Sequence, residues 1–245
     1  MHPTNILEAK RSWKSIKRVA NRLSNTHVVL CPPSIYISAL YSHRVNNVMG
    51  IGAQNVFFEE QGAFTGEIGP AMFKDLGVTH IIVGHSERRA GIGGDMETDA
   101  IVARKAQAVL ESGMHPIMCI GEKDRDINGL YLDILKNQIK NSLSGINKKF
   151  ANQIIIAYEP LWAVGAKEAM DISTINEMAI FIKKVISDIY GHEIAISMKV
   201  LYGGAVNFRN AGDIILKGGV DGLLVGRESV NAPGFVELLK VVDPI

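Results

Sequence analysis

A carboxylate at the end of an apolar run is the first group whose type and position suggest chemistry. Glu159 follows residues 154–158, an isoleucine-rich run of the kind that a strand buried on both faces requires. Parallel barrels place their reactive side chains at the carboxyl ends of their strands, so Glu159 is a candidate catalytic base. The alternative is that Glu159 caps the next loop or pairs with an arginine, the commoner role of a carboxylate at an arbitrary strand end.

The residues after Glu159 favour the catalytic interpretation. Pro160 fixes the backbone where the strand ends, and residues 162–164 are too apolar for a permanently exposed loop. We therefore predict a lid that closes over the site and excludes water from a charged intermediate. Its predicted residues are Pro160, Leu161, Trp162, Ala163, Val164, Ala166 and Lys167.

A histidine follows a second apolar run. His85 comes just after the strand-like residues 78–83, and a lone histidine in such a place is more often structural than catalytic. Here Ser86 and Glu87 supply partners that can fix its tautomer and orient its ring. A helical turn beginning at Ser86 would also lower the pKa of His85, because its backbone N–H groups would face the ring. The next two residues are interpreted as members of structural ion pairs: Arg88 and Arg89.

Two glycine-containing turns after later strands are candidates for binding an anion. One contains Gly203, Gly204 and Ala205, and the other contains Gly226 and Arg227. Glycine lets backbone N–H groups approach a phosphate, and barrels commonly hold phosphate after their last strands. Either segment alone could be a plain turn. The prediction of an anion site therefore rests on the occurrence of two such turns after successive strands. A base, a histidine, a lid and an anion site together suit proton transfer beside a carbonyl of a small phosphorylated substrate, without a cofactor or metal.

Composition indicates an ordinary globular chain. The 245 residues are 47% hydrophobic and 21% charged, and 26 Lys and Arg balance 25 Asp and Glu. No long-range field therefore attracts nucleic acid or an acidic membrane, and any anion site must be local. Cys31 and Cys119 lie in apolar runs, which is typical of buried thiols in a reducing cytoplasm. We find no signal peptide, membrane span or metal-binding spacing, and we expect a cytoplasmic protein.

Apolar periodicity alternates along the chain between the strand and the helix repeat. Strands that alternate with helices require parallel pairing and right-handed crossovers, and the glycines and carboxylates at the strand ends favour a closed barrel over an open doubly wound sheet. We predict one (βα) barrel domain over residues 1–245, with a long loop at 54–69 that is functional or contacts another surface. The predicted strands are 27–31, 48–52, 78–83, 116–120, 154–158, 198–202 and 222–225, and the predicted helices are 5–23, 33–43, 95–112, 129–143, 172–190, 208–217 and 233–242.

Several motifs in a fixed order resemble the triosephosphate isomerase family. They are residues 157–165 around Glu159 and residues 84–89 around His85, together with 52–55, 62–67, 119–122 and 202–204. The resemblance runs from Met1 to about Val242. It implies a TIM barrel in which Glu159 takes a proton from C1 of dihydroxyacetone phosphate and returns it to C2, while His85 stabilises the enediolate.

The resemblance also assigns supporting roles. It implies a homodimer in which one loop inserts into the neighbouring subunit, which would explain the length of segment 54–69. The implied phosphate-binding residues are Gly165, Ala205, Gly226 and Arg227; the implied supporting residues are Ser86, Glu87 and Cys119; the implied dimer-loop residues are Phe64, Thr65, Gly66 and Glu67.

The sequence departs from the family pattern at several places. The first strand of the family ends in Asn-X-Lys-Met, and Met1 coincides with that Met, so we expect seven strands, no counterpart of that Asn and Lys, and two unpaired edges. A start assigned too late or a remodelled barrel would explain this. Segment 166–168 is one residue shorter than the usual Thr-Gly-Lys segment, Ala205 replaces a Ser, and Arg227 replaces a Gly.

These departures keep three functions under consideration. The expected one is the interconversion of dihydroxyacetone phosphate and glyceraldehyde 3-phosphate in glycolysis and gluconeogenesis. An isomerase of the same family acting on a tetrulose phosphate is compatible with the altered lid and anion site. A pseudoenzyme or interaction protein that retains only the scaffold is the third, and a coupled isomerase assay separates it from the other two.

Overall fold

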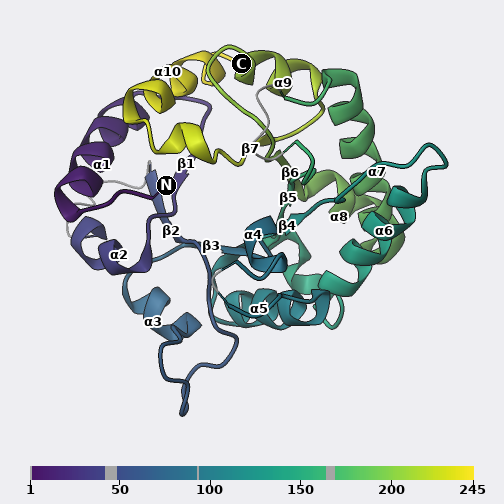
Figure 1. The fold of residues 1–245 in the computed structure, drawn as a ribbon, viewed down its shortest axis with the longest axis horizontal. Helices are drawn as coiled ribbons and strands as arrows, with labels where there is room; N and C mark the ends of the chain where they lie inside the picture. Colours follow the sequence, from purple (N-terminus) through teal and green to yellow (C-terminus); the bar gives the residue numbers. More distant parts are fainter. Residues whose placement is uncertain (1, 42–48, 93, 164–168) are drawn as a thin grey trace.

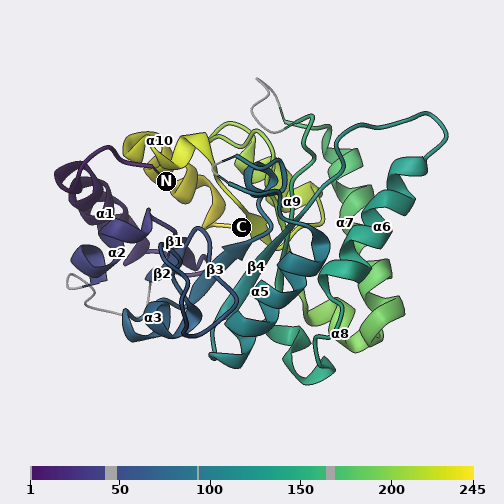
Figure 2. The same ribbon diagram turned by 60° about the horizontal axis from the view of Figure 1, so that its bottom comes forward.

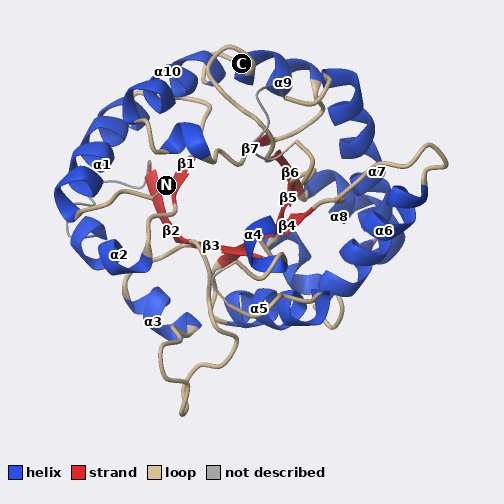
Figure 3. Ribbon diagram, viewed as in Figure 1, coloured by secondary structure: helices blue, strands red, loops and turns tan. Residues whose placement is uncertain are grey.

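Seven parallel strands curl around a common axis inside a ring of helices (Figures 1 and 3). The computed structural model describes residues 2–41, 49–92, 94–163 and 169–245. Across these residues the strands form one sheet in sequence order, and no pairing joins β7 to β1. The strands are β1 (Val28–Leu30), β2 (Met49–Ala53), β3 (His80–Val83), β4 (His115–Ile120), β5 (Ile155–Tyr158), β6 (Lys199–Tyr202) and β7 (Gly222–Leu223). The predicted seven-stranded parallel barrel architecture is confirmed.

Helices cover the outer face of the sheet, as the turned view in Figure 2 also shows. The predicted helices are all present, α7 with the predicted ends and the others with ends that differ by a few residues; positions 42 and 43 of the helix predicted over 33–43 lie outside the described residues. The helices are α1 (Ile6–Ala20), α2 (Ser34–Tyr41), α3 (Pro70–Asp75), α4 (Ser86–Arg89), α5 (Asp99–Glu111), α6 (Leu130–Ser142), α7 (Ile172–Tyr190), α8 (His192–Ser197), α9 (Ala211–Lys217) and α10 (Ala232–Val242), with 3-10 turns η1 (Lys148–Gln153) and η2 (Arg227–Ser229). The sequence pattern missed α3, α8 and η1, which are too short to show a helical period.

Local sequence sets the ends of α7, whose predicted and observed bounds coincide. The side chain of Asp171 accepts from the backbone N–H groups of Ser173 and Thr174, so it satisfies donors that a helix start leaves without partners. Gly191 ends the helix with φ +97°, a conformation that a side chain would disfavour. Between these ends, an apolar face that includes Ile175 and Ile182 is buried.

The core has two layers of unequal burial. Between sheet and helices, Ile81, Val83 and many others are fully buried. Inside the barrel, Cys119 and Ala157 are buried, but other inward-facing side chains are only partly buried: Ile82, Ile155, Leu201 and Leu224. Incomplete burial inside the barrel is what a sheet with two unpaired edges predicts.

The first and last helices of the ring meet on the outer surface. Helices α1 and α10 pack side by side, and the Asp243 carboxylate accepts from the backbone N–H groups of Ser24, Asn25 and Thr26. This network closes the ring of helices between its first and last members (Figure 1). Among the described residues, none of the helices combines the length and the apolar character that crossing a bilayer would need.

Candidate active site

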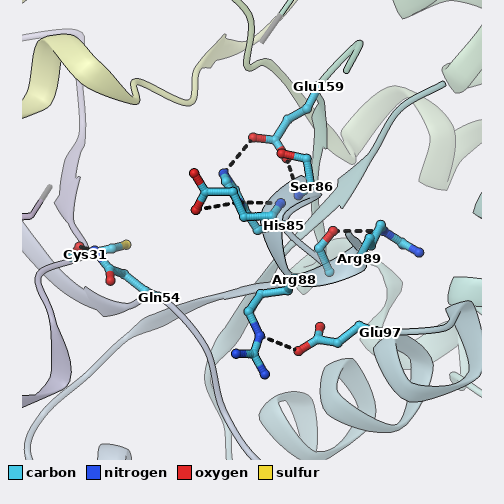
Figure 4. Close-up of polar contacts among 10 residues, drawn as sticks. Cys31, Gln54, His85, Ser86, Arg88, Arg89, Glu97 and Glu159 are labelled. Carbon is cyan, nitrogen blue, oxygen red and sulfur yellow. Dashed lines mark hydrogen bonds and ion pairs between the residues drawn. The ribbon is translucent and has the colours of Figure 1, made fainter. Parts of the chain in front are cut away.

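The strand ends bring His85 and Glu159 into direct contact. His85 follows β3 and Glu159 follows β5, with β4 paired between them. The His85 Nε2 atom lies 3.2 Å from Glu159 Oε1 (Figure 4). Glu159 is only 3% exposed, whereas the His85 ring remains partly open to solvent. A buried carboxylate and a partly exposed imidazole therefore lie in hydrogen-bonding contact, the arrangement that acid–base chemistry requires.

Close backbone packing fixes the position of Glu159. Its backbone N–H donates to the Ile120 carbonyl at 2.7 Å, which continues the ladder beyond β4 and β5. A Cβ at Gly121 would lie 1.9 Å from the Glu159 carbonyl oxygen, and one at Gly203 would lie 2.7 Å from Glu159 Cγ. The backbone N–H of Ser86 donates to Glu159 Oε2 at 3.4 Å. Only glycine fits at the two neighbouring positions, so the main chain and not a flexible side chain determines where the carboxylate lies.

The tautomer of His85 follows from its backbone partner. The backbone N–H of Glu87 donates to His85 Nδ1 at 3.3 Å, so the neutral ring carries its proton on Nε2, toward Glu159. Helix α4 begins at Ser86 as predicted. The pKa of His85 is nevertheless raised, because the hydrogen bond and charge of Glu159 outweigh the lowering effect of burial. The expected lowering of this pKa is thus wrong while the carboxylate contacts the ring.

Cys119, predicted to support the site, lies next to the Glu159 carboxylate at the inner face of β4. The thiol is fully buried, and its pKa is raised well above the ordinary value by burial, by the negative charge of Glu159 and by a hydrogen bond with it. Burial likewise raises the pKa of Cys31 to about 12. Both thiols stay protonated at neutral pH, which makes them poor nucleophiles.

The described start of the predicted lid is tied to a second buried carboxylate. Glu122 Oε1 accepts from Trp162 Nε1 at 3.1 Å, from Tyr158 Oη at 2.8 Å and from Arg125 Nε at 2.8 Å. Ala163 is buried, but Trp162 remains 44% exposed. The other predicted lid residues and one predicted phosphate ligand lie outside the described residues: Val164, Gly165, Ala166 and Lys167.

Sequence reasoning missed this cluster, although Glu122 belongs to one of the motifs. Its detectable signal was an acidic residue close to the end of a buried strand, similar to the pattern that singled out Glu159. Arg125 gave no signal, because it reaches Tyr158 Oη at 2.9 Å only after the loop beyond β4 turns back over β5.

The three described phosphate candidates lie on the same rim of the barrel as His85 and Glu159. Ala205 follows β6, and its carbonyl accepts from Asn210 Nδ2 at 2.9 Å, which fixes the turn. Gly226 precedes η2, and the space where its Cβ would point is open. Arg227 is the first residue of η2 and is exposed. Because all strands run in parallel, their carboxyl ends meet at this one rim.

The predicted dimer loop lies away from His85 and Glu159. Segment 54–69 runs from β2 to α3 and projects from the body of the molecule (Figure 1). Phe64 is 41% exposed and packs its ring 4.7 Å from that of Phe57. The rest of the predicted dimer loop is also exposed: Thr65, Gly66 and Glu67.

Both arginines after Glu87 form ion pairs, as interpreted from sequence. Arg88 Nε lies 2.9 Å from Glu97 Oε1, which also accepts from the buried Lys105. Arg89 Nη1 lies 2.6 Å from Asp99 Oδ1. The sequence did not reveal their acidic partners, which are nine and ten residues away and are brought near by the turn before α5.

The chain is similar to triosephosphate isomerases over nearly its whole length. The family model for triosephosphate isomerase matches residues 1–242. The triosephosphate isomerase of Dehalococcoides mccartyi is 39% identical over 238 residues, covering 97% of this chain and 92% of that protein. That of Endomicrobium trichonymphae is 37% identical over 237 residues, covering 96% and 93%. That of Fusobacterium nucleatum is 37% identical over 238 residues, also covering 96% and 93%.

These similarities coincide with the geometry. The matched region includes every strand of the barrel, and the catalytic candidates stand at the carboxyl ends of β3 and β5. The comparisons favour an isomerase of triose phosphates over a tetrulose phosphate isomerase or a scaffold without activity. This chain belongs to the triosephosphate isomerase family.

Proposed function

We propose that this chain interconverts dihydroxyacetone phosphate and D-glyceraldehyde 3-phosphate, the triose phosphate isomerisation of glycolysis and gluconeogenesis. The observation that carries the proposal is the 3.2 Å contact between His85 Nε2 and Glu159 Oε1, in a chain whose relatives bear the name of this enzyme. The reaction moves one proton between neighbouring carbons, so a base and a hydrogen-bond donor are sufficient.

Glu159 acts as the base in this mechanism. Its carboxylate removes a proton from C1 of dihydroxyacetone phosphate, and the electron pair of that C–H bond forms the enediolate. A proton passes from the C1 hydroxyl oxygen to the C2 oxygen, carried by His85, and the carboxyl group returns its own proton to C2, which yields glyceraldehyde 3-phosphate with its carbonyl at C1. His85 donates from Nε2 to the oxygen on which negative charge develops, and the Glu87 N–H at Nδ1 supports this tautomer.

Substrate binding must separate the two groups. At 3.2 Å the imidazole and carboxylate leave no room for a carbon atom between them. A bound triose would replace this contact with two new ones, from the ring to the carbonyl and from the carboxylate to the C–H group. The loss of the carboxylate also removes the contact that raises the pKa of His85, so the ring stays neutral and can donate.

The phosphate is proposed to bind at the rim formed after β6 and β7. Backbone N–H groups at Ala205, Gly226 and Arg227 are the candidates, joined by Gly165 from the lid. The open space around Gly226 allows close approach of an anion. The Trp162–Glu122 bond supports an anchor for the first residues of the proposed lid.

An isomerase assay in deuterated water tests the proposal. We expect turnover in both directions and incorporation of one solvent deuterium at the carbon that receives the proton, because a carboxyl proton exchanges with solvent. Turnover more than about a thousandfold below that of other family members would favour the scaffold alternative. Efficient conversion of a tetrulose phosphate with little conversion of the triose would favour the other isomerase.

A homodimer is proposed through segment 54–69. The exposed Phe64 and the aromatic packing beneath it provide an apolar anchor of the kind that protein interfaces use. Sedimentation of the purified protein over a range of concentrations tests this. We further propose that residues 1–245 fold as one domain, which a single cooperative unfolding transition would support, and that the protein works in the cytoplasm, where buried reduced thiols are stable.

A further inference from the structure

Arg89 joins the two strand ends on which the catalytic pair depends. Its side chain is only 12% exposed and makes four contacts. Arg89 Nε donates to the Gly84 carbonyl at 2.9 Å, and Nη2 donates to the Cys119 carbonyl at 3.2 Å. Nη2 also donates to Ser142 Oγ at 3.2 Å, and Nη1 pairs with Asp99 at 2.6 Å.

Each of the two carbonyls belongs to a residue that adjoins or contacts one of the proposed catalytic residues. Gly84 is the residue before His85 and has φ +67°, so its peptide orientation decides where the ring points. Cys119 is opposite Ala157 in the β4–β5 register, and its thiol is hydrogen-bonded to Glu159. The guanidinium therefore connects the end of β3, which carries the histidine, to the strand that supports the glutamate.

The planar guanidinium is suited to this connection. Its N–H groups have fixed directions, so one side chain can hold two carbonyls and a carboxylate at set spacings. Asp99, the first residue of α5, and Ser142, the last residue of α6, hold the guanidinium from the outer side. Ser142 Oγ also donates to Asp99 Oδ1 at 3.4 Å. The ring of helices thus holds Arg89 against the barrel end.

We propose that Arg89 is a positioning residue that sets the distance between His85 and Glu159 by holding the carbonyls of Gly84 and Cys119. Arg89 does not reach the reacting atoms. Its kinetic consequences rest on the proposed isomerase function, whereas the geometry it imposes can be measured without turnover.

Arg89→Lys is the principal test, and Arg88→Lys is its matched control. Lysine keeps the charge opposite Asp99, but its ammonium group lacks the planar array of N–H donors that holds two carbonyls in fixed directions. Arg88 lies in the same short helix and is ion-paired at 2.9 Å, yet none of its hydrogen bonds in the described structure goes to a strand-end carbonyl. Both variants should fold, which thermal unfolding will verify. If Arg89→Lys does not fold, Asp99→Asn serves instead, because it loosens the guanidinium while leaving both carbonyl bonds.

Two measurements are made on each variant. In Arg89→Lys we expect kcat to fall by about 10- to 100-fold with KM within about twofold, since misplacement of reacting groups by about 1 Å has effects of this size. For Arg88→Lys we expect kcat within about twofold of wild type, and for Asp99→Asn we expect kcat to fall several-fold.

The second measurement is the NMR titration of the His85 ring, whose signal is assigned with the His85→Gln variant. In Arg89→Lys its pKa should decrease by at least about half a pH unit as Glu159 moves away, and in Arg88→Lys it should not.

The two proposals fail separately. A wild-type protein without turnover would end the isomerase proposal, and the titration would still decide the role of Arg89. An unchanged His85 titration in a folded Arg89→Lys variant would overturn the positioning role. The positioning role would also be overturned if Arg89→Lys and Arg88→Lys lost kcat equally and the losses followed the decrease in melting temperature.

Discussion

His85 Nε2 and Glu159 Oε1 lie 3.2 Å apart although 73 residues separate them in the chain. β3 and β5 deliver the two groups from either side of β4, so neither strand alone creates the site. The Glu87 N–H orients the ring and the Ser86 N–H contacts the carboxylate, so one short helix start serves both groups. The contact between His85 and Glu159 therefore depends on how β3, β4 and β5 pair with one another.

Replacing Glu159 with glutamine should remove the base while keeping the shape of the side chain. We expect kcat to fall by about 10³- to 10⁴-fold, within the range that general base catalysis contributes. Glu237→Gln, a change on the exposed face of α10, is the control and should retain wild-type turnover. Steady-state assays in both directions measure the effect, and full kcat in Glu159→Gln would show that the base has been assigned wrongly.

Removing the Tyr158 hydroxyl should destabilise the protein. The hydroxyl donates to both oxygens of Glu122, at 2.8 and 3.0 Å, and accepts from Arg125 at 2.9 Å. Glu122 is 1% exposed, so Tyr158→Phe leaves a buried carboxylate with fewer donors, and we expect a loss of about 1–3 kcal/mol. Tyr190→Phe, which loses weaker bonds to backbone carbonyls, should cost less in denaturant unfolding. The reverse order would contradict the assigned network.

The stability of the protein should decrease as the pH falls below neutrality. The pKa of His80 is lowered to about 4, first by burial and then by the charges of His115 and His27, whose rings lie 5.0 and 6.1 Å away. In the unfolded chain His80 has an ordinary pKa near 6.5, so as the pH falls it binds a proton that the folded chain does not bind. Stability is therefore complete above about pH 6.5 and decreases toward pH 4.

For this half-buried ring we expect a loss of about 1 kcal/mol between pH 7 and pH 5. The His80→Gln variant should show a flatter dependence in urea unfolding at a series of pH values. Thr79 Oγ1 lies 2.9 Å from His80 Nδ1 and gives the substituted amide a partner. His192→Gln, in the short helix α8, serves as control. An equally steep dependence in His80→Gln would exclude this histidine as the cause.

Introducing a charge at the tip of segment 54–69 should weaken self-association. We expect Phe64→Asp to raise the dissociation constant of the homodimer by roughly 100-fold, because buried aromatic anchors contribute most of the energy of such interfaces. Ile127→Asp, another exposed apolar position, is the control and should leave assembly unchanged. Sedimentation velocity distinguishes the two, and an unaffected Phe64→Asp dimer would place the interface elsewhere.

Breaking the buried Lys105–Glu97 pair should cost about 3 kcal/mol or more. Both side chains are almost completely buried, and Lys105→Met leaves the Glu97 carboxylate with Arg88 as its remaining charged partner in the described structure. The double variant Lys105→Met with Glu97→Leu should recover part of the loss, because it removes the unpaired charge. Chemical denaturation of the single and double variants measures this coupling, and additive losses would argue against it.

The sequence predicted the architecture because its periodicity is local. Seven apolar runs and the helical patterns between them correspond to β1–β7 and the longer helices, and α7 was predicted with the observed ends. Short elements such as α3 and α8 escaped prediction, since six residues cannot display a helical period. The end of β7 was overestimated because an apolar run continues beyond Leu223, where the ladder stops.

Residue type, strand-end position and neighbouring residues were enough to predict Glu159 and His85 as candidates on one rim, because parallel strands present their carboxyl ends together. Only the tertiary structure determined whether the pKa of His85 is raised or lowered. A turn at Ser86 suggested a lowered pKa for His85, but the carboxylate that β5 brings to 3.2 Å raises it. The sequence likewise did not predict the contacts of Arg89 and Glu122. Electrostatic and hydrogen-bond energies depend on distances in space, which spacing along the chain does not determine.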